Sequence, residues 1–288
     1  LMKNIKYFFQ FLGIIFLILI NYILGLKYSL KLSSSIFLFL GPLFKSKNIS
    51  ENNLIKAFPQ KSEKERKKII NEMWINYGKI FAEYIFIKKF RKSEKFSKKI
   101  YIKNQEVLDQ IKIDNEPVIF ISGHFNNFEL MAMQIEKSGV SLAAIYRPLN
   151  NIFINKIIEP LRRKYICKKQ IKKGISGLRE MLKLYKKGYS VAMMIDQRVS
   201  EGIKSNLFNF PALTTTVPAQ MIKKFNCKII PVYTKRIDKF NYEINIEEPL
   251  SISSDQTIQE ITDNLNLCLE NMIKKNPDQW IWSHNRWK

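Results

Sequence analysis

The feature that most constrains the fold is an uncharged apolar run near the N-terminus. Residues Tyr7 to Leu26 read YFFQFLGIIFLILINYILGL and contain no charged side chain, whereas Lys3 and Lys6 precede the run and Lys27 and Lys31 follow it. A helix of about 20 apolar residues is long enough to cross the hydrocarbon core of a bilayer. The chain must therefore fold with this segment at a membrane, or else bury a wholly apolar helix.

Three interpretations of the run compete. A cleaved signal peptide has a shorter apolar core and a small-residue cleavage site, which the large and charged residues after the run do not supply. A buried core helix shows polar positions on one face. A membrane anchor fits best, and the next apolar stretch, Ile36 to Phe44, could lie along the membrane surface. We therefore expect an anchor and interfacial segment over residues 1–44 and a globular domain over residues 45–288.

The charge of the chain predicts its orientation and its partners. The sequence has 48 Lys and Arg against 25 Asp and Glu, a net charge of +23. Basic residues favour the cytoplasmic side, so we expect a single N-terminal anchor with the main domain on the cytoplasmic face of the membrane. An anionic partner is also expected: nucleic acid, a membrane surface or an acidic carrier protein. Richness in Lys, Ile and Asn is typical of AT-rich genomes too, so composition alone leaves this partner open.

Beyond residue 100, short apolar runs alternate with helical patterns. Strands are predicted at 117–122, 140–146, 189–195 and 228–233, with an edge strand at 242–246. Helices are predicted at 127–138, 152–165, 175–187, 217–225 and 255–274. Ser62 and Glu65 predict a capping box before an earlier amphipathic helix, and Thr216 is a candidate N-cap. The alternation indicates an α/β layer structure without a second globular domain.

One of the two histidines lies where α/β proteins place their chemistry. His124 directly follows the first predicted buried strand, and sites in open α/β sheets gather at the carboxyl ends of strands. If a helix begins at Asn127, Glu129 lies in its first turn, where its carboxylate can orient the imidazole and stabilise the imidazolium. His124 would then act as a general base on a substrate hydroxyl. The alternative is a histidine that only caps the helix or packs in the loop.

The motif GHFNNFE at 123–129 resembles the His-x4-Glu motif of the late acyltransferases of lipid A biosynthesis, the lauroyl and myristoyl transferases of the lysophospholipid acyltransferase superfamily. Further matches follow in the family's order: Tyr146-Arg147-Pro148, Arg162 or Arg163, Asp196-Gln197, the segment 210–216 and the C-terminal tail 277–286. Two departures are Phe128, where the family usually has Trp, and a displaced glycine after Asp196-Gln197. With the anchor, the resemblance covers nearly the whole chain.

The resemblance implies a fold and an activity. The fold would be a glycerol-3-phosphate acyltransferase-like mixed sheet flanked by helices, with an N-terminal membrane-anchor helix and a catalytic domain at 45–288. The activity would be transfer of a fatty acyl group from acyl carrier protein to a hydroxyl of a lipid A precursor. The acidic carrier protein would suit the basic chain.

Roles follow for five residues. His124 is expected to be the base and Glu129 its orienting carboxylate. Arg147 and Arg162, with backbone amides near 123–127, would stabilise the oxyanion, or the arginines would bind acceptor phosphates. Asp196 would orient an arginine or a substrate hydroxyl, or form a structural salt bridge.

Other chemistries lack their motifs. The sequence has no Gly-x-Ser-x-Gly elbow, no Walker A loop and no dinucleotide-binding glycine motif, and its three cysteines are far apart. We therefore expect direct acyl transfer with no cofactor and no metal. One alternative is an acyltransferase acting on a glycerophospholipid or another glycolipid. The other is a basic membrane-tethered protein that binds nucleic acid or anionic lipid, although we expect no nucleic-acid partner.

Overall fold

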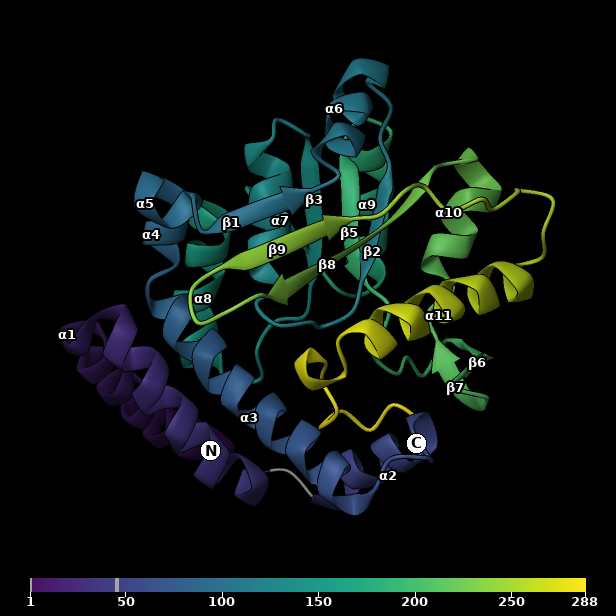
Figure 1. The fold of residues 1–288 in the computed structure, drawn as a ribbon. Helices are drawn as coiled ribbons and strands as arrows, with labels where there is room; N and C mark the ends of the chain where they lie inside the picture. The colour runs from purple at the N-terminus through teal and green to yellow at the C-terminus, as the bar shows by residue number, and fades with distance from the viewer. Residues whose placement is uncertain (1, 45–46) are drawn as a thin grey trace.

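The computed structural model describes residues 2–44 and 47–288 (Figure 1). Its helices are α1 (Met2–Phe44), α2 (Lys47–Ala57), α3 (Glu63–Ile85), α4 (Ile87–Lys92), α5 (Glu94–Ser97), α6 (Gln105–Asp114), α7 (Glu129–Lys137), α8 (Ile152–Tyr165), α9 (Ile175–Tyr185), α10 (Val217–Phe225) and α11 (Ile258–Lys275). Its strands are β1 (Ile100–Lys103), β2 (Ile119–Ser122), β3 (Leu142–Tyr146), β4 (Lys169–Lys172), β5 (Ser190–Met194), β6 (Ile203–Leu207), β7 (Phe210–Thr214), β8 (Ile229–Arg236) and β9 (Tyr242–Ile246).

The main sheet is mixed, as the resemblance implied. Among the described residues it has seven strands in the order β1-β9-β8-β2-β5-β3-β4. Strands β8 and β9 pair antiparallel, while β2 pairs parallel with both β5 and β8. The predicted strand 242–246 is present as β9, but its edge position was wrong, because β1 pairs with it on the outer side.

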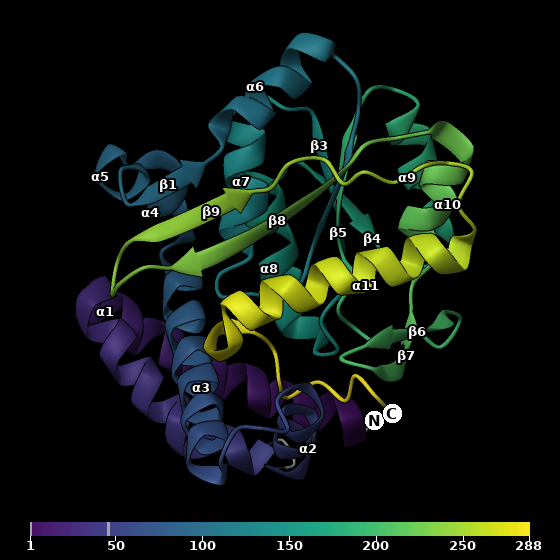
Figure 2. The same cartoon turned by 45° about the vertical axis from the view of Figure 1, so that its right-hand side comes forward.

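Helices cover both faces of this sheet (Figures 1 and 2). Along β2 the side chains alternate, so that Ile119 and Ile121 join one apolar cluster while Phe120 joins another. The first cluster is closed by residues of α9, α10 and α11, and the second by residues of α6 and α7. A strand buried on both faces reads as a continuous apolar run, which is why the sequence revealed it.

The N-terminal apolar run is not one straight helix. Helix α1 contains a break at Gly25, whose φ of 71° and ψ of 165° are not helical. The first arm, residues 2–24, folds back on the second, residues 26–44. The buried Asn21 fixes this turn: its side-chain oxygen accepts from Ser33 (2.9 Å) and its carbonyl accepts from Ser29 (2.5 Å). Glycine suits the position because φ is positive.

The second arm packs closely along α3, and the two run side by side in Figures 1 and 2. A Cβ added at Gly78 would lie 2.3 Å from the carbonyl oxygen of Ser33, so only glycine allows this approach. The predicted capping box at the start of α3 is confirmed, with the amide of Ser62 donating to Glu65 (2.8 Å). Helix α3 thus connects the apolar hairpin to the α/β core.

Some elements were missed from the sequence. Strands β1 and β4 are only four residues long, and β6 and β7 form a separate two-stranded antiparallel sheet. Helix α10 has the predicted bounds, but Thr216 makes no side-chain cap; the Thr215 hydroxyl accepts from the amide of Val217 instead (3.3 Å).

Candidate active site

The sheet brings His124 and Asp196 together. Strands β2 and β5 are parallel neighbours, and Ser122 at the end of β2 is in register with Met194 at the end of β5. His124 and Asp196 each follow two residues later, so they leave the same edge of the sheet side by side. Loops at the carboxyl ends of parallel strands are where α/β proteins place their sites.

Asp196 holds both the side chain and the backbone of His124. Nδ1 of the imidazole lies 2.8 Å from Asp196 Oδ1, and the amide of His124 donates to Asp196 Oδ2 at 2.6 Å. The Asp196 side chain is fully buried, whereas that of His124 is 21% exposed. The ring therefore has one nitrogen fixed by a carboxylate, and the side chain remains partly exposed. This is the carboxylate–imidazole unit that prepares a histidine to accept a proton.

The electrostatics of the pair favour a charged imidazole. Burial of the ring lowers the pKa of His124, but the negative charge of Asp196 and its hydrogen bond raise it more, so the net pKa lies above the ordinary histidine value. Burial raises the pKa of Asp196, yet the contact with His124 lowers it overall. Each partner thus stabilises the charged form of the other.

The sequence predicted Glu129 as the partner of the imidazole, and the structure gives this contact to Asp196. Glu129 instead pairs with Arg162 on α8: its Oε1 lies 2.8 Å from Nε and 2.5 Å from Nη2 of the guanidinium. Glu129 still lies near enough for its charge to raise the pKa of His124. The arginine also packs over the ring of Tyr146, with 5.5 Å to its centroid. The two carboxylates therefore hold two different groups.

Four of the five backbone amides at 123–127, offered for the oxyanion, are occupied. These four donate within the protein: His124 to Asp196 Oδ2 (2.6 Å), Phe125 to Gly123 O (2.8 Å), Asn126 to Gln279 O (2.9 Å) and Asn127 to Asn126 Oδ1 (2.6 Å). Helix α7 begins at Glu129, two residues later than the predicted start at Asn127. Side-chain donors therefore suit an oxyanion better than these amides.

Of the two predicted arginines, only Arg162 is in the cluster. Its side chain is 13% exposed and is bound to Glu129. Arg147 follows the end of β3 and is exposed. An exposed guanidinium at this edge of the sheet suits an anionic group of a substrate, because it keeps its donors available.

Two further residues shape the site. The indole nitrogen of Trp280 donates to Asp196 Oδ2 at 2.9 Å, so the C-terminal tail helps to fix the carboxylate. Trp280 and Trp282 are both buried, so this part of the tail is packed into the core. At Gly123 an added Cβ would lie 2.9 Å from the ring of Phe125 and 3.2 Å from Asp196 Oδ2.

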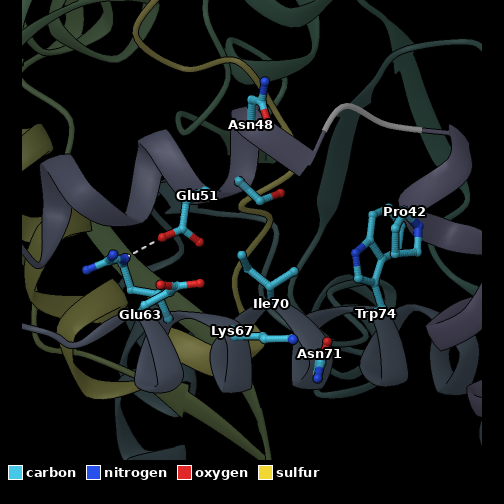
Figure 3. Close-up of a pocket in the computed structure, with 10 residues that line it drawn as sticks. Pro42, Asn48, Glu51, Glu63, Lys67, Ile70, Asn71 and Trp74 are labelled. Atoms are coloured by element: carbon cyan, nitrogen blue, oxygen red, sulfur yellow. Dashed lines mark hydrogen bonds and ion pairs between the residues drawn. The ribbon is translucent and has the colours of Figure 1, made fainter.

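A large cavity lies elsewhere. It has a volume of about 530 Å³ and lies among Pro42 of α1, Glu51 of α2, and Arg66 and Trp74 of α3 (Figure 3). Arg66 pairs with Glu51 there at 2.5 Å. None of its lining residues is one of the five predicted site residues.

The protein is an α/β protein with a mixed sheet. At the carboxyl ends of its parallel strands β2 and β5, a buried carboxylate contacts a partly exposed imidazole, a pair suited to general acid–base chemistry. A family model described as bacterial lipid A biosynthesis acyltransferase matches residues 1–288. The chain belongs to this family, and it is an acyltransferase of lipid A biosynthesis.

Relatives support this placement. The chain is 25% identical over 239 residues to lipid A biosynthesis acyltransferase 2 of Shigella flexneri, covering 80% of this chain and 74% of the relative. It is 22% identical over 233 residues to the lipid A biosynthesis myristoyltransferase of Escherichia coli strain K12, covering 80% and 71%. With a lipid A biosynthesis acyltransferase of Haemophilus influenzae the identity is 20% over 283 residues, covering 96% and 86%.

Proposed function

We propose that the protein transfers a fatty acyl group from acyl carrier protein to a hydroxyl of a lipid A precursor, with His124 as the general base. The observation that carries this proposal is the contact of His124 Nδ1 with the buried Asp196, which leaves the ring partly exposed. The family supplies the reaction class, and the resemblance implies the donor and the acceptor. The net charge of +23 favours an acidic carrier protein.

The reaction needs one base and one oxyanion site. Nε2 of His124 takes the proton of the acceptor hydroxyl while its oxygen attacks the thioester carbonyl. When the tetrahedral intermediate collapses, the C–S bond breaks and the imidazolium returns the proton to the thiolate. Asp196 holds the imidazole in one tautomer and stabilises its charged form. General base catalysis typically contributes about 10²–10⁴-fold in rate.

In this mechanism Glu129 does not orient the imidazole of His124, although the sequence had predicted that role. We assign it to holding Arg162, whose guanidinium would face the oxyanion or an acceptor phosphate. The charge of Glu129 also raises the pKa of His124, so it supports the base without touching Nδ1. Arg147 would bind the anionic part of the acceptor.

Residues 1–44 form the proposed membrane segment, and residues 45–288 the catalytic domain. Helix α1 is long and apolar enough to cross a membrane by length and composition, and little of its most apolar stretch is buried in the protein. Both ends of its first arm nevertheless contact the globular domain. The carbonyl of Tyr7 accepts from Asn151 (2.8 Å), and Tyr22 stacks on Phe86 at 6.2 Å. We place the hairpin in the cytoplasmic leaflet of the inner membrane, with the catalytic domain on the cytoplasmic face.

Product analysis tests the proposal. The full chain in detergent micelles receives labelled acyl-acyl carrier protein and either a lipid A precursor or a lysophospholipid. The proposal predicts acylation of the lipid A precursor at an existing hydroxyl, detected by mass spectrometry. Product from the lysophospholipid alone would support the glycerophospholipid alternative. Binding of anionic lipid with no acyl transfer to either acceptor would contradict the enzymatic assignment.

A further inference from the structure

A buried ion pair contacts the loop that follows His124. Glu83 on α3 and Arg236 at the end of β8 have side chains that are 0% and 6% exposed, and their charged atoms lie 2.6 Å apart. Tyr242 on β9 donates to the same carboxylate oxygen at 2.6 Å and accepts from Arg236 at 2.8 Å. A buried pair of this kind is weak evidence for stability, since well-packed apolar residues often serve as well. The other groups that the two charged side chains bind are therefore more informative than the pair itself.

The pair reaches the His124 loop through two asparagines. Asn127 Nδ2 donates to Glu83 Oε2 at 2.9 Å, and Arg236 Nη2 donates to Asn126 Oδ1 at 3.0 Å. Both asparagines are almost completely buried, at 0% and 1% exposure. Hydrogen bonds to charged partners are stronger than neutral ones and hold their geometry more firmly.

Asn126 has a backbone that needs such support. Its φ of 43° lies in the left-handed region, which costs a non-glycine residue free energy and persists only where the surroundings hold it. Its amide donates to Gln279 O and its side-chain nitrogen to Gln279 Oε1, each at 2.9 Å. The amide of Arg236 donates to the same Gln279 Oε1 at 2.8 Å. The turn after His124 is thus held from α3, β8 and the C-terminal tail together.

We propose that Glu83 and Arg236 are positioning residues for the active site. They fix Asn126 and Asn127, which lie in the chain between His124 on one side and Glu129 with its bound Arg162 on the other. The spacing between the base and the arginine then depends on an ion pair that does not enter the chemistry. This inference rests on the proposed role of His124, and it adds two residues that the sequence analysis did not find.

The first test is Glu83→Gln in the full chain, assayed with acyl-acyl carrier protein and a lipid A precursor. A glutamine has one acceptor oxygen in place of two, so it cannot serve Arg236 and Asn127 together. We expect kcat to fall about 10²-fold, the effect of displacing a reacting group by roughly 1 Å, while KM stays within about twofold. The acid limb of the pH–rate profile should also move to lower pH, toward the ordinary pKa of histidine, because the contact of His124 with Asp196 loosens.

A matched control separates positioning from general stability. Glu136→Gln breaks the ion pair of Glu136 with Arg91 (2.7 Å), whose side chains are 14% and 21% exposed. Glu136 bonds to Arg91 and to the amide of Lys168 rather than to the His124 loop. We expect this variant to keep the parent kcat. A fall in kcat shared equally by both variants, or explained by a smaller folded fraction, would overturn the proposal.

A double variant keeps the test decisive if Glu83→Gln unfolds. Glu83→Leu with Arg236→Met removes both charges, so no unpaired charge remains buried. We expect a folded protein with a lower melting temperature, because Asn126, Asn127 and the Tyr242 hydroxyl lose partners while buried. We also expect kcat, measured per folded molecule, to be lowered about 10²-fold, because the loop is no longer fixed. Parent-like turnover in the folded double variant would refute positioning. His124→Ala measured in parallel tests the base itself: if it keeps its turnover, the proposed function fails irrespective of Glu83.

Discussion

At the scale of single residues, the two carboxylates near His124 have exchanged the partners expected for them. Asp196 binds the imidazole, and Glu129 binds the arginine. The sequence pointed to all of these residues: His124 and Glu129 by their place after the first predicted strand, and Arg162 and Asp196 through the resemblance to the lipid A acyltransferases. It did not identify the pairs, because the order of strands in the sheet is not readable from one sequence. Only the adjacency of β2 and β5 brings Asp196 to His124.

Asp196→Asn should lower kcat about 10⁴-fold, as loss of the carboxylate does in hydrolase triads. It should also shift the pH dependence of kcat/KM. The contact with Asp196 raises the pKa of His124, so the wild-type acid limb lies above the ordinary value of about 6.5. Without the carboxylate this limb should move to lower pH. The measurement is kcat/KM between pH 5 and 9. An acid limb at the same pH in both proteins would contradict the role of Asp196 as the partner of His124.

Glu129 and Arg162 should act as one unit. Glu129→Gln, Arg162→Lys and the double variant form a cycle in which the losses in kcat/KM are not additive. Contacting residues couple by about 0.5–3 kcal/mol, and we expect a value within this range. Full additivity would indicate that the contact has no part in transition-state binding.

At the scale of elements, the sequence was most informative where a pattern is local. Continuous apolar runs gave the central strands, and helical spacing gave α8 and α10 with their observed bounds. The four-residue strands β1 and β4 escaped because so short a run has no readable period. The break at Gly25 escaped too, since a glycine inside an apolar run does not reveal a positive φ.

The contact of α1 with α3 gives a prediction about stability. Gly78→Ala places a Cβ 2.3 Å from the carbonyl oxygen of Ser33, so the helices must separate. We expect destabilisation by about 1–3 kcal/mol, measured as a lower melting temperature. Gly13→Ala is the matched control, because nothing lies within 4 Å of its added Cβ. An equal effect in both variants would mean that the close approach of the helices is not stabilising.

At the scale of the whole molecule, the contacts of the apolar hairpin bear on how it lies in the membrane. A segment lying in one leaflet leaves both ends of its first arm on the same side of the membrane, whereas a spanning helix separates them. The contacts of Tyr7 with Asn151 and of Tyr22 with Phe86 favour the first arrangement. The buried Asn21 suits it also, because polar side chains hold apolar helices together within a membrane.

Thiol labelling tests this topology. Lys3→Cys and Lys27→Cys place reactive groups at the two ends of the first arm, and the parent gives the background of the native cysteines. In inverted inner-membrane vesicles, a membrane-impermeant reagent should label both variants. Labelling of Lys27→Cys alone would show that the first arm spans the bilayer.

The most direct test of the central claim is the turnover of His124→Ala with acyl-acyl carrier protein and a lipid A precursor. We expect a folded, membrane-bound protein whose kcat falls by at least about 10²-fold, since the base that accepts the hydroxyl proton is gone. Near-wild-type turnover in a variant with an unchanged melting temperature would contradict it.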